Sequence, residues 1–442
     1  MLSDASTAVV RDTLPLVESA LGEISKRFYD RLFAAHPGLL RNLFNRGNQA
    51  VGSQQQALAG AFASFAGTLV HNPDQRPDVL LSRIANKHAS LGISPGQYPV
   101  VHEHLTAAIG EVLGDPFTAE VAAVWSDVYW LMANSLIRIE QRLYAQHGVL
   151  VGSTWRPWTV TARTQETDDV TSFALTPADH AGAPAFRPGQ YVSVQVQLPD
   201  GANQIRQYSL SRAAGEDDTR HITVKRVHGR GNPDGEVSNH LHEHLHEGDT
   251  LNVSAPYGDL VIKDTTAPLL LASAGIGCTP MLAMLEQLAV QGHRGAVTVV
   301  HGDRTAAEHA LRTQQKNLTG RLADGRTHFW YERPHGADPE DLTGLVDISR
   351  ISLPDNVHAY LCGPLPFMRT VRTQLLARGV SPAHIHYEVF GPDLWLGTED
   401  RSPDQGGQVE PDHPVQREDG AGHHQNQPSH RKTVLVSAPE DL

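Results

Sequence analysis

Residues 269–282 read LLLASAGIGCTPML, and this stretch decides how the second half of the chain folds. The apolar run before Gly275 predicts a buried strand, and the apolar run after Pro280 predicts a helix. Gly275 and Gly277 allow a close approach of the backbone, and the N-terminus of the following helix offers free N–H groups to a diphosphate. Pro280 suits the first helical turn, where a missing N–H costs nothing. The stretch therefore predicts a nucleotide-binding turn, with a merely tight strand–helix turn as the alternative.

The sequence downstream of this turn supports a parallel sheet. Strand-like and helix-like segments alternate from residue 265 onward, as they do in α/β domains. The segment 358–364, HAYLCGP, ends a further strand with Cys362, Gly363 and Pro364. The carboxyl edge of such a sheet is where ligands bind, so these residues and the glycine-rich turn are expected to meet there.

Upstream, residues 152–264 contain six short strand-like segments separated by turn clusters, with little helix. This pattern predicts a closed antiparallel barrel. One predicted strand begins with Arg206, Gln207, Tyr208 and Ser209. An arginine, an aromatic ring and a hydroxyl on one strand can hold a phosphate, stack on a ring and hydrogen-bond to it.

The first 148 residues show helical periodicity and almost no strand alternation, so they predict an all-α domain. Four polar side chains fall on the apolar stripes of these helices: Tyr29, Gln54, His88 and Glu140. Polar groups that face inward are costly unless they meet a polar partner or ligand. For His88 alone, a hydrogen-bonded core histidine is the alternative to a ligand of a metal.

Composition limits the class of protein. A length of 442 residues predicts about three domains. The net charge of −13 argues against nucleic acid or an anionic membrane as the main partner. Two cysteines cannot build a disulfide framework, the N-terminus has no secretory signal and no apolar run is long enough for a membrane span. We expect a cytoplasmic protein, with a disordered tail at 393–442 that carries ten acidic and four basic residues.

Three motifs in order, RQYS at 206–209, GIGCTP at 275–280 and LCGP at 361–364, resemble the ferredoxin-reductase family. In that family a flavin-binding barrel precedes a nicotinamide-binding domain. The resemblance implies an FAD site formed by Tyr191, Arg206, Gln207, Tyr208, Ser209, Gly235, Val237 and Ser238. It implies a nicotinamide dinucleotide site formed by Gly275, Ile276, Gly277, Cys278, Thr279, Pro280, Cys362, Gly363 and Pro364.

The helical half together with the reductase motifs resembles the flavohaemoglobin family. The segments that carry this resemblance are YDRLFAAHPGLLRNLF at 29–44, GSQQQALAGAF at 52–62, RIANKHASLGISPGQY at 83–98 and HYEVFGP at 386–392. The resemblance implies a multi-domain chain with an all-α globin domain at 1–148, an antiparallel β-barrel FAD domain at 152–264 and an α/β parallel-sheet NAD(P) domain at 265–392. The implied cofactors are haem b, FAD and NADH or NADPH.

The same resemblance assigns roles in the globin domain. His88 is the implied iron ligand, supported by Tyr98 and Glu140 behind it. Tyr29 and Gln54 are expected to donate hydrogen bonds to dioxygen, in a pocket where Leu58 limits the space and Phe44 packs on the porphyrin. Lys87 and Glu388 are expected to bridge the haem and flavin domains, and the flavin-facing C-terminal segment comprises Glu388, Val389, Phe390, Gly391 and Pro392.

The implied activity is that of a nitric oxide dioxygenase, which uses NAD(P)H to convert nitric oxide and dioxygen to nitrate and thereby detoxifies nitric oxide. The alternatives are a flavohaem reductase for peroxide or ferric iron, and a haem-based gas sensor or oxygen carrier with its own reductase. The protein is expected to be a monomer. Arg304 alone does not decide between NADH and NADPH.

A run of alternating histidines invites a different hypothesis, that of a metal site. The resemblance places a helix and loop in this region, so these side chains are expected on the surface, with no metal. They are His240, His242, His244 and His246.

Overall fold

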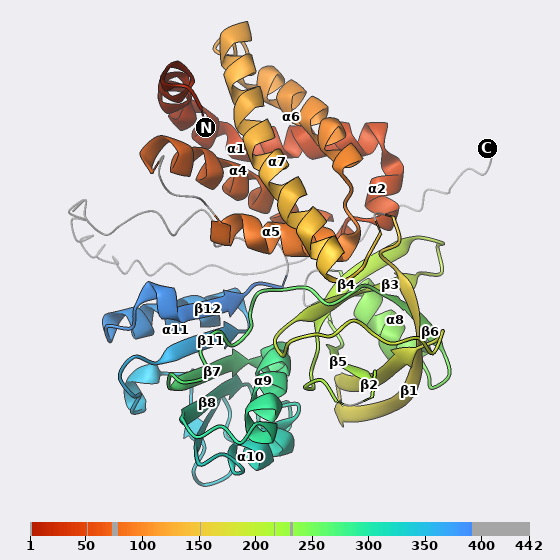
Figure 1. The fold of residues 1–442 in the computed structure, drawn as a ribbon, viewed down its shortest axis with the longest axis vertical. Coiled ribbons are helices and arrows are strands. Elements are labelled where there is room, and N and C mark those ends of the chain that lie inside the picture. The colour runs from red at the N-terminus through yellow and green to blue at the C-terminus, as the bar shows by residue number, and fades with distance from the viewer. Residues whose placement is uncertain are drawn as a thin grey trace, which may run out of the picture. The chain divides into compact units, whose positions relative to one another are not determined.

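The computed structural model describes residues 2–50, 52–72, 78–150, 152–215, 217–229 and 233–390 (Figure 1). Two regions follow the order that the sequence predicts, a helical one and then one built on two sheets. The predicted tail at 393–442, together with Gly391 and Pro392, lies outside the described residues.

Helices alone make up the N-terminal region. They are α1 (Asp4–Ala35), α2 (Pro37–Asn42), α3 (Arg46–Ala50), α4 (Ser53–His71), α5 (Asp78–Leu91), α6 (Tyr98–Leu113) and α7 (Ala119–Gln146), with a 3₁₀ turn, η1 (Pro95–Gln97), before α6. Helix α1 ends at Ala35, directly before the predicted His36–Pro37 boundary. Its N-terminus is capped by Ser3, and Thr118 caps α7 in the same way. Helix α1 packs on α4 and α6, while α5 packs on α7, so the core lies among the long helices.

The middle region is the predicted barrel. Its strands are β1 (Arg156–Thr167), β2 (Val170–Pro177), β3 (Tyr191–Gln197), β4 (Asn203–Ser209), β5 (Arg220–Lys225) and β6 (Thr250–Val253), with helix α8 (Glu236–His244) between the last two. The antiparallel order is β4-β3-β6-β1-β2-β5. A bridge between Leu210 and Ile222 joins the two outer strands, and this contact closes the barrel.

The C-terminal sheet is entirely parallel, with the order β10-β9-β8-β7-β11-β12. Its strands are β7 (Leu269–Ala274), β8 (Ala296–Asp303), β9 (Asp324–Tyr331), β10 (Leu342–Thr343), β11 (His358–Cys362) and β12 (Ile385–Glu388). The helices are α9 (Cys278–Val290), α10 (Arg312–Thr319) and α11 (Leu365–Ala377), with 3₁₀ turns η2 (Gly275–Gly277), η3 (Ile348–Arg350) and η4 (Pro382–His384).

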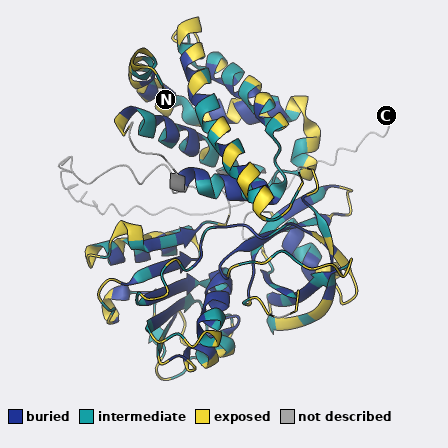
Figure 2. Ribbon diagram, in the orientation of Figure 1, coloured by how far each residue is buried: buried dark blue, intermediate teal, exposed yellow. Residues whose placement is uncertain are grey.

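Both faces of this parallel sheet are covered. Alternate residues of β7 point into two cores, with Leu269 and Leu271 in the one that includes α9 and Leu270 and Ala272 in the one that includes α11. Figure 2 shows the strands as mostly buried ribbon and the helices with an exposed outer face. The strand order reverses between β7 and β11, and a sheet of this kind binds ligands at the carboxyl ends of the strands beside such a reversal.

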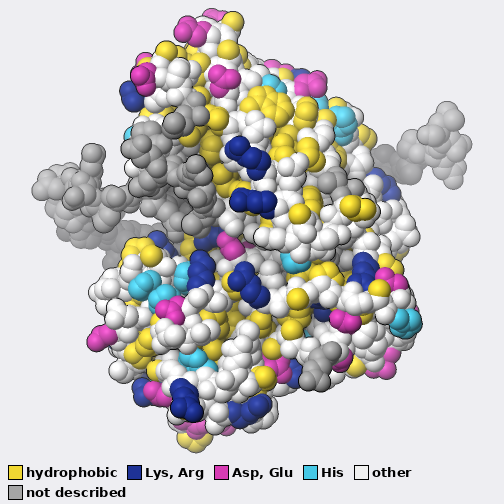
Figure 3. All heavy atoms as spheres, in the orientation of Figure 1, with side chains coloured by type: hydrophobic (Ala, Val, Ile, Leu, Met, Phe, Trp, Pro, Cys, Tyr) yellow, Lys and Arg dark blue, Asp and Glu magenta, His cyan; other side chains and the backbone are white. Residues whose placement is uncertain are grey.

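None of the described helices is both long and apolar enough to cross a membrane. On the face drawn in Figure 3, basic side chains lie among acidic, histidine and apolar ones. Within the described ranges, no three His, Cys, Asp or Glu side chains gather in a way that could hold a metal ion by themselves.

Candidate functional site

His88 lies on α5 with its imidazole held from behind. Its Nδ1 is 2.8 Å from Glu140 Oε1 and 3.1 Å from the hydroxyl of Tyr98, and that hydroxyl donates to the same carboxylate oxygen over 2.6 Å. A carboxylate only accepts, so Nδ1 carries the proton and the lone pair is on Nε2. Nε2 has no hydrogen-bond partner in the described part of the chain, and 32% of the His88 side chain is exposed while Glu140 is 2% exposed. A neutral imidazole with a free Nε2 fits a haem iron.

Burial also acts on the tyrosine of this cluster. Desolvation raises the pKa of Tyr98, and the Glu140 carboxylate raises it further. The phenol therefore stays protonated and keeps donating to Glu140. The hydroxyl of Tyr129 donates to the backbone carbonyl of Tyr98 over 2.7 Å, which fixes the start of α6.

The predicted distal residues gather elsewhere in the same helical core. Tyr29 on α1 is 4% exposed, and desolvation raises the pKa of its phenol. A hydrogen bond with the Gln54 side chain acts in the opposite direction on that pKa, so the two polar groups are in contact. The ring of Phe44 meets Tyr29 edge-on at 5.8 Å, and Leu58 on α4 packs against the same core. The structure thus brings Tyr29, Gln54 and Phe44 together.

Helix α5 also contacts the barrel, through two residues that sequence reasoning missed. Asn86 Oδ1 accepts a hydrogen bond from the Gly258 N–H over 2.8 Å. Ser90 accepts one from Ser193 on β3 over 2.9 Å. Asn86 and Ser90 are one turn apart and each lies two residues from His88, so they point away from the imidazole. Their only sequence signal is that two polar residues share a helix face that proves to be buried.

A directed chain of hydrogen bonds continues from this contact into the predicted flavin strand. Gln207 Nε2 donates to Ser193 Oγ over 3.1 Å, Ser193 donates to Ser90, and Ser90 donates to the carbonyl of Lys87 over 2.8 Å. The predicted bridging residue Lys87 is thus connected to the barrel through its backbone.

The predicted diphosphate residues face one another across β4 and α8. Arg206 is half-buried on β4, and desolvation lowers the pKa of its guanidinium. Its Nη1 donates to the Ile205 carbonyl, and no ion pair of Arg206 occurs in the described ranges. A guanidinium beside a helix N-terminus fits a diphosphate. Val237 is buried in the barrel core, and Ser238 bonds to the Val227 N–H and the Gly235 carbonyl, so this turn offers mainly backbone N–H groups.

Four predicted residues meet beside β3. The β11–β12 register pairs Cys362 with Glu388. Burial raises the pKa values of both Cys362 and Tyr191, and the Glu388 carboxylate raises them further. The rings of Tyr191 and Phe390 meet edge-on at 6.0 Å. Tyr208 is half-buried and Ser209 buried at the end of the neighbouring strand, where Ser209 pairs with Tyr191. The side chains of Tyr191, Cys362, Glu388 and Phe390 form an aromatic and carboxylate cluster that fits a flavin ring, and Tyr208 packs against the barrel core beside it.

The turn after β7 and the end of β11 touch. A Cβ added to Gly277 would lie 2.3 Å from the carbonyl oxygen of Cys362, so only glycine allows this approach. Gly275 has φ +53°, a backbone conformation that residues with a side chain rarely adopt, and the space around it is open. Glycine is therefore favoured here by the backbone conformation and not by close packing. Thr279 donates to the Ile276 carbonyl over 3.0 Å and closes the turn. The start of α9 and the Gly363–Pro364 turn thus flank the strand reversal, where a dinucleotide fits.

One thiol and one arginine remain among the predicted residues of this region. Burial raises the pKa of Cys278 to about 12, and its Sγ lies 3.6 Å from the Ala310 carbonyl, so it behaves as a small core residue. Arg304 pairs with Glu308, whose carboxylate also pairs with Arg333 over 3.4 Å. The guanidinium of Arg304 is therefore engaged within the chain.

The histidine run needs one correction. The expected helix is present, but His242 is not a surface group. It is 7% exposed, with Nε2 2.9 Å from the Val224 carbonyl and Nδ1 3.3 Å from the Thr171 hydroxyl. An α-helix has 3.6 residues per turn, so residues two positions apart point in different directions. His242 therefore points into the barrel, while His244 is exposed.

Comparison with known proteins matches three families in chain order. The globin family matches residues 26–136, the oxidoreductase FAD-binding domain matches 157–262 and the oxidoreductase NAD-binding domain matches 271–373. A flavohemoprotein of Rhizobium meliloti is 42% identical over 406 residues, which cover 89% of this chain and all of the relative.

Two solved structures are similar as well. A flavohemoglobin from Malassezia yamatoensis with bound FAD and heme is 36% identical, with a TM-score of 0.80 over 88% of this chain and 100% of that one. The flavohem-like FAD/NAD binding domain of a nitric oxide dioxygenase from Vibrio cholerae is 38% identical, with a TM-score of 0.51 over 54% of this chain and all of that one. With its globin domain, FAD domain and NAD domain in this order, the chain belongs to the flavohemoprotein family of oxidoreductases, which bind haem, FAD and a nicotinamide dinucleotide.

Proposed function

We propose that this chain is a nitric oxide dioxygenase that converts two nitric oxide and two dioxygen molecules to two nitrate ions, with one NAD(P)H oxidised and one proton released. The observation that carries the proposal is the Glu140–His88 pair. A carboxylate that accepts a hydrogen bond from the Nδ1–H gives the imidazole anionic character and makes Nε2 a stronger electron donor to a metal. Such a donor suits oxygen chemistry, whereas an oxygen carrier benefits from a weaker one.

When bound, the dinucleotide supplies a hydride, FAD divides it into single electrons and the haem iron is where nitric oxide and dioxygen combine. The chain's own residues position these groups. His88 is the proposed iron ligand, and Tyr98 keeps the Glu140 oxygen in place by donating to it. Elsewhere in the same helical core, Tyr29 and Gln54 are the proposed donors to the oxygen substrate, among neighbouring rings that bury Tyr29.

Helix α5 carries both the proposed iron ligand and the residues that contact the barrel. His88 points to one side of this helix, and Asn86 and Ser90 hold the barrel on the other. Helix α5 would therefore lie between the haem that His88 would hold and the barrel surface that Asn86 and Ser90 contact. Gln207, Tyr208 and Ser209 would hold the flavin on β4, with Glu388 and Phe390 beside Tyr191. Arg206 and the start of α8 would hold its diphosphate.

The test mixes the protein loaded with haem and FAD with NADH, dioxygen and nitric oxide. Nitrate should form in a one-to-one ratio to the nitric oxide consumed, with half as much NADH oxidised. A flavohaem reductase would oxidise NADH with peroxide or ferric iron and give no stoichiometric nitrate. A gas sensor or carrier would show ligand binding with slow NADH turnover, and either result would reject the dioxygenase.

The preference for NADH or NADPH is the second property to measure. Arg304 pairs with Glu308 in this structure, and this ion pair by itself sets no preference for NADH or NADPH. Steady-state rates with NADH and NADPH, compared as kcat/KM, test this preference directly.

A further inference from the structure

Arg46, the first residue of α3, reaches from the helical region to the barrel. Its Nη1 lies 2.6 Å from Asp200 Oδ2, and its Nη2 and Nε lie 2.8 Å and 3.2 Å from the two carboxylate oxygens of Glu236. A bidentate contact of this kind is among the strongest that a guanidinium and a carboxylate make. About a quarter of the Arg46 side chain and about a third of the Glu236 side chain are exposed, at 26% and 36%. Neither side chain has a role in the sites described above.

The carboxylate of Glu236 lies at the proposed diphosphate site. Glu236 is the first residue of α8, and the N-terminus of this helix together with Arg206 is where the diphosphate is proposed to bind. The N-terminus of a helix attracts an anion through its free N–H groups and its dipole. A carboxylate in the first turn repels a second anion at the same helix end, unless a cation neutralises it.

Arg46 and Arg206 meet at one amide oxygen. Gln204 Oε1 accepts a hydrogen bond from Arg206 Nη1 over 3.4 Å and one from the Arg46 N–H over 3.5 Å. Gln204 is fully buried and its Nε2 donates to backbone carbonyls of α2, so this contact fixes the two arginines relative to each other. Burial lowers the pKa of Arg206, while the Glu236 charge acts to raise that pKa and the Arg46 charge acts to lower it. Both charges therefore act at the guanidinium of Arg206.

We propose that Arg46 is a positioning residue of the FAD site, a role that rests on the diphosphate site of the proposed function. Its pairing with Glu236 neutralises this carboxylate beside the diphosphate that Arg206 and the start of α8 would hold. Without Arg46, Glu236 keeps its charge and loses its partner, and the diphosphate meets a net repulsion. Because the pair joins α3 to α8, a side chain of the helical region thus sets how tightly the barrel holds FAD.

The test measures the dissociation constant of FAD by flavin fluorescence, in the full chain loaded with haem and freed of FAD. Arg46→Met should weaken FAD binding at least fivefold and leave the haem absorbance unchanged. Glu236→Gln removes the opposing charge and should bind FAD at least as tightly as the parent chain. In the Glu236→Gln background, Arg46→Met should change the affinity less than twofold, because the carboxylate that Arg46 neutralises is gone. An equal loss in both backgrounds would mean a merely structural role and would overturn the proposal.

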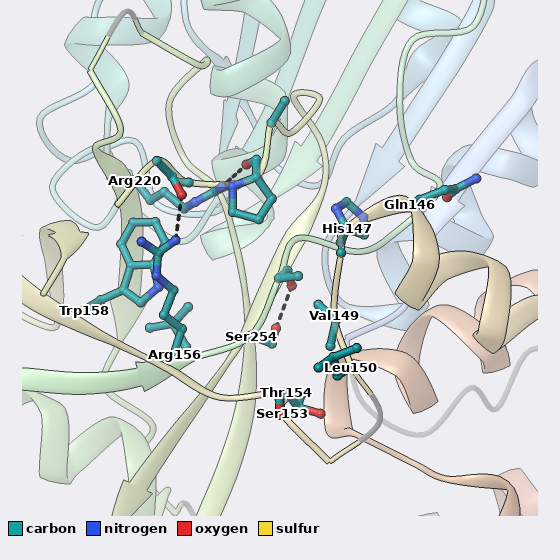
Figure 4. Close-up of a pocket in the computed structure, with 17 residues that line it drawn as sticks. Gln146, His147, Val149, Leu150, Ser153, Thr154, Arg156, Trp158, Arg220 and Ser254 are labelled. Atoms are coloured by element: carbon teal, nitrogen blue, oxygen red, sulfur yellow. Dashed lines mark hydrogen bonds between the residues drawn. The ribbon is translucent and has the colours of Figure 1, made fainter. Parts of the chain in front are cut away.

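Arg156 on β1 is the matched control. It also pairs with an aspartate, and its side chain is 24% exposed, against 26% for Arg46. Figure 4 shows Arg156 beside Trp158, on the wall of a cavity of about 680 Å³ that none of the residues proposed to hold FAD lines. Arg156→Met should therefore leave the FAD dissociation constant within about twofold of the parent value. A loss equal to that of Arg46→Met would reflect a missing ion pair in general and would reject the role of Arg46.

Arg206→Met separates the role of Arg46 from the diphosphate site on which it rests. This variant removes the proposed phosphate contact and should weaken FAD binding at least tenfold. If Arg206→Met weakens FAD binding and Arg46→Met does not, the role of Arg46 is rejected while the proposed diphosphate site stands. If neither variant weakens FAD binding, the diphosphate site is misassigned and the role of Arg46 is rejected with it.

Discussion

One carboxylate, that of Glu140, decides which nitrogen of His88 faces the proposed iron. It lies 52 positions along the chain from His88, on α7, and it is almost fully buried. Helical periodicity predicts that both residues face inward, because each falls on an apolar stripe. Periodicity cannot predict that the two meet, since it gives the face of a helix and not its partner. The pairing came from the family resemblance, and the structure places the two atoms 2.8 Å apart.

Replacing this carboxylate gives the first prediction. Glu140→Gln keeps the shape but removes the charge, so haem should still bind through His88 while nitrate formation falls about 10–100-fold. Haem absorbance measures occupancy and nitrate measures turnover. Tyr98→Phe is the matched control: it removes one hydrogen bond worth about 1 kcal/mol, so the loss should stay within about fivefold. Equal losses in both variants would assign the effect to geometry rather than charge.

At the scale of elements, the β7–α9 turn shows two glycines with different tasks. Gly275→Ala places a side chain at φ +53° in open space, which costs about 1–2 kcal/mol. Gly277→Ala must push the turn away from the Cys362 carbonyl at the end of β11. We expect Gly277→Ala to raise the NADH concentration for half-maximal flavin reduction tenfold or more, and Gly275→Ala to raise it less. Stopped-flow flavin reduction measures both, and a milder Gly277→Ala would contradict the close approach.

The parallel-sheet region also contains buried and half-buried histidines that predict its acid sensitivity. Burial lowers the pKa of His386 on β12 to about 4, and burial also lowers the pKa values of His301 and His309, whose rings stack at 3.7 Å. In the unfolded chain these groups bind protons near pH 6.5. Between about pH 6.5 and 4 the unfolded state therefore binds more protons, and the free energy of unfolding falls as the pH falls.

The corresponding variant is His386→Gln. Going from pH 7.5 to 5.5, it should lose about 1 kcal/mol less unfolding free energy than the parent chain, the figure being reduced for partial exposure. Urea unfolding at the two pH values measures this difference. His335→Gln, at an exposed loop position, is the control and should behave like the parent. A His386→Gln protein with the parent's pH dependence would show that this imidazole does not contribute.

Individual helices and strands were predicted better than the contacts between them. The barrel strands, the strands β7, β8 and β11 of the parallel sheet and the helix end at His36–Pro37 follow from alternation and from proline, which are local signals. The strands β9, β10 and β12 were not predicted. The closure of the barrel between Leu210 and Ile222, and the pairing of Cys362 with Glu388, depend on contacts between distant segments. The burial of His242 on α8 was missed for the same reason, because the Thr171 hydroxyl that meets it belongs to β2, a distant segment of the chain.

At the scale of the molecule, the order of helical, barrel and α/β regions was predicted correctly. The charge of −13 was less informative, since ten acidic and four basic residues lie in 393–442, outside the described residues. The contacts between the helical region and the barrel could not be predicted. Gln204 donates to backbone carbonyls of Arg41 and Phe44, and Arg46 pairs with Asp200 and Glu236.

The separate roles proposed for the helical region and for the two sheet regions give the last prediction. His88→Ala should abolish haem binding and leave NADH-driven flavin reduction within about twofold, because the proposed flavin and dinucleotide residues lie outside the helical region, on β3, β4, α8, η2, α9, β11 and β12. Haem absorbance and anaerobic flavin bleaching are the two readouts. Loss of both functions in a folded protein would mean that the roles of the regions were misassigned.

The hydrogen bonds that Asn86 and Ser90 make with the barrel have a consequence for the exchange of domains between relatives. A globin region transplanted onto another reductase would have to bring, besides an iron ligand, the side chains that meet Gly258 and Ser193. A chimaera joined only at the connecting segment near residue 150 would bind each cofactor but lack these hydrogen bonds between the helical region and the barrel. In this chain the boundary that matters for exchange is a surface rather than a point in the sequence.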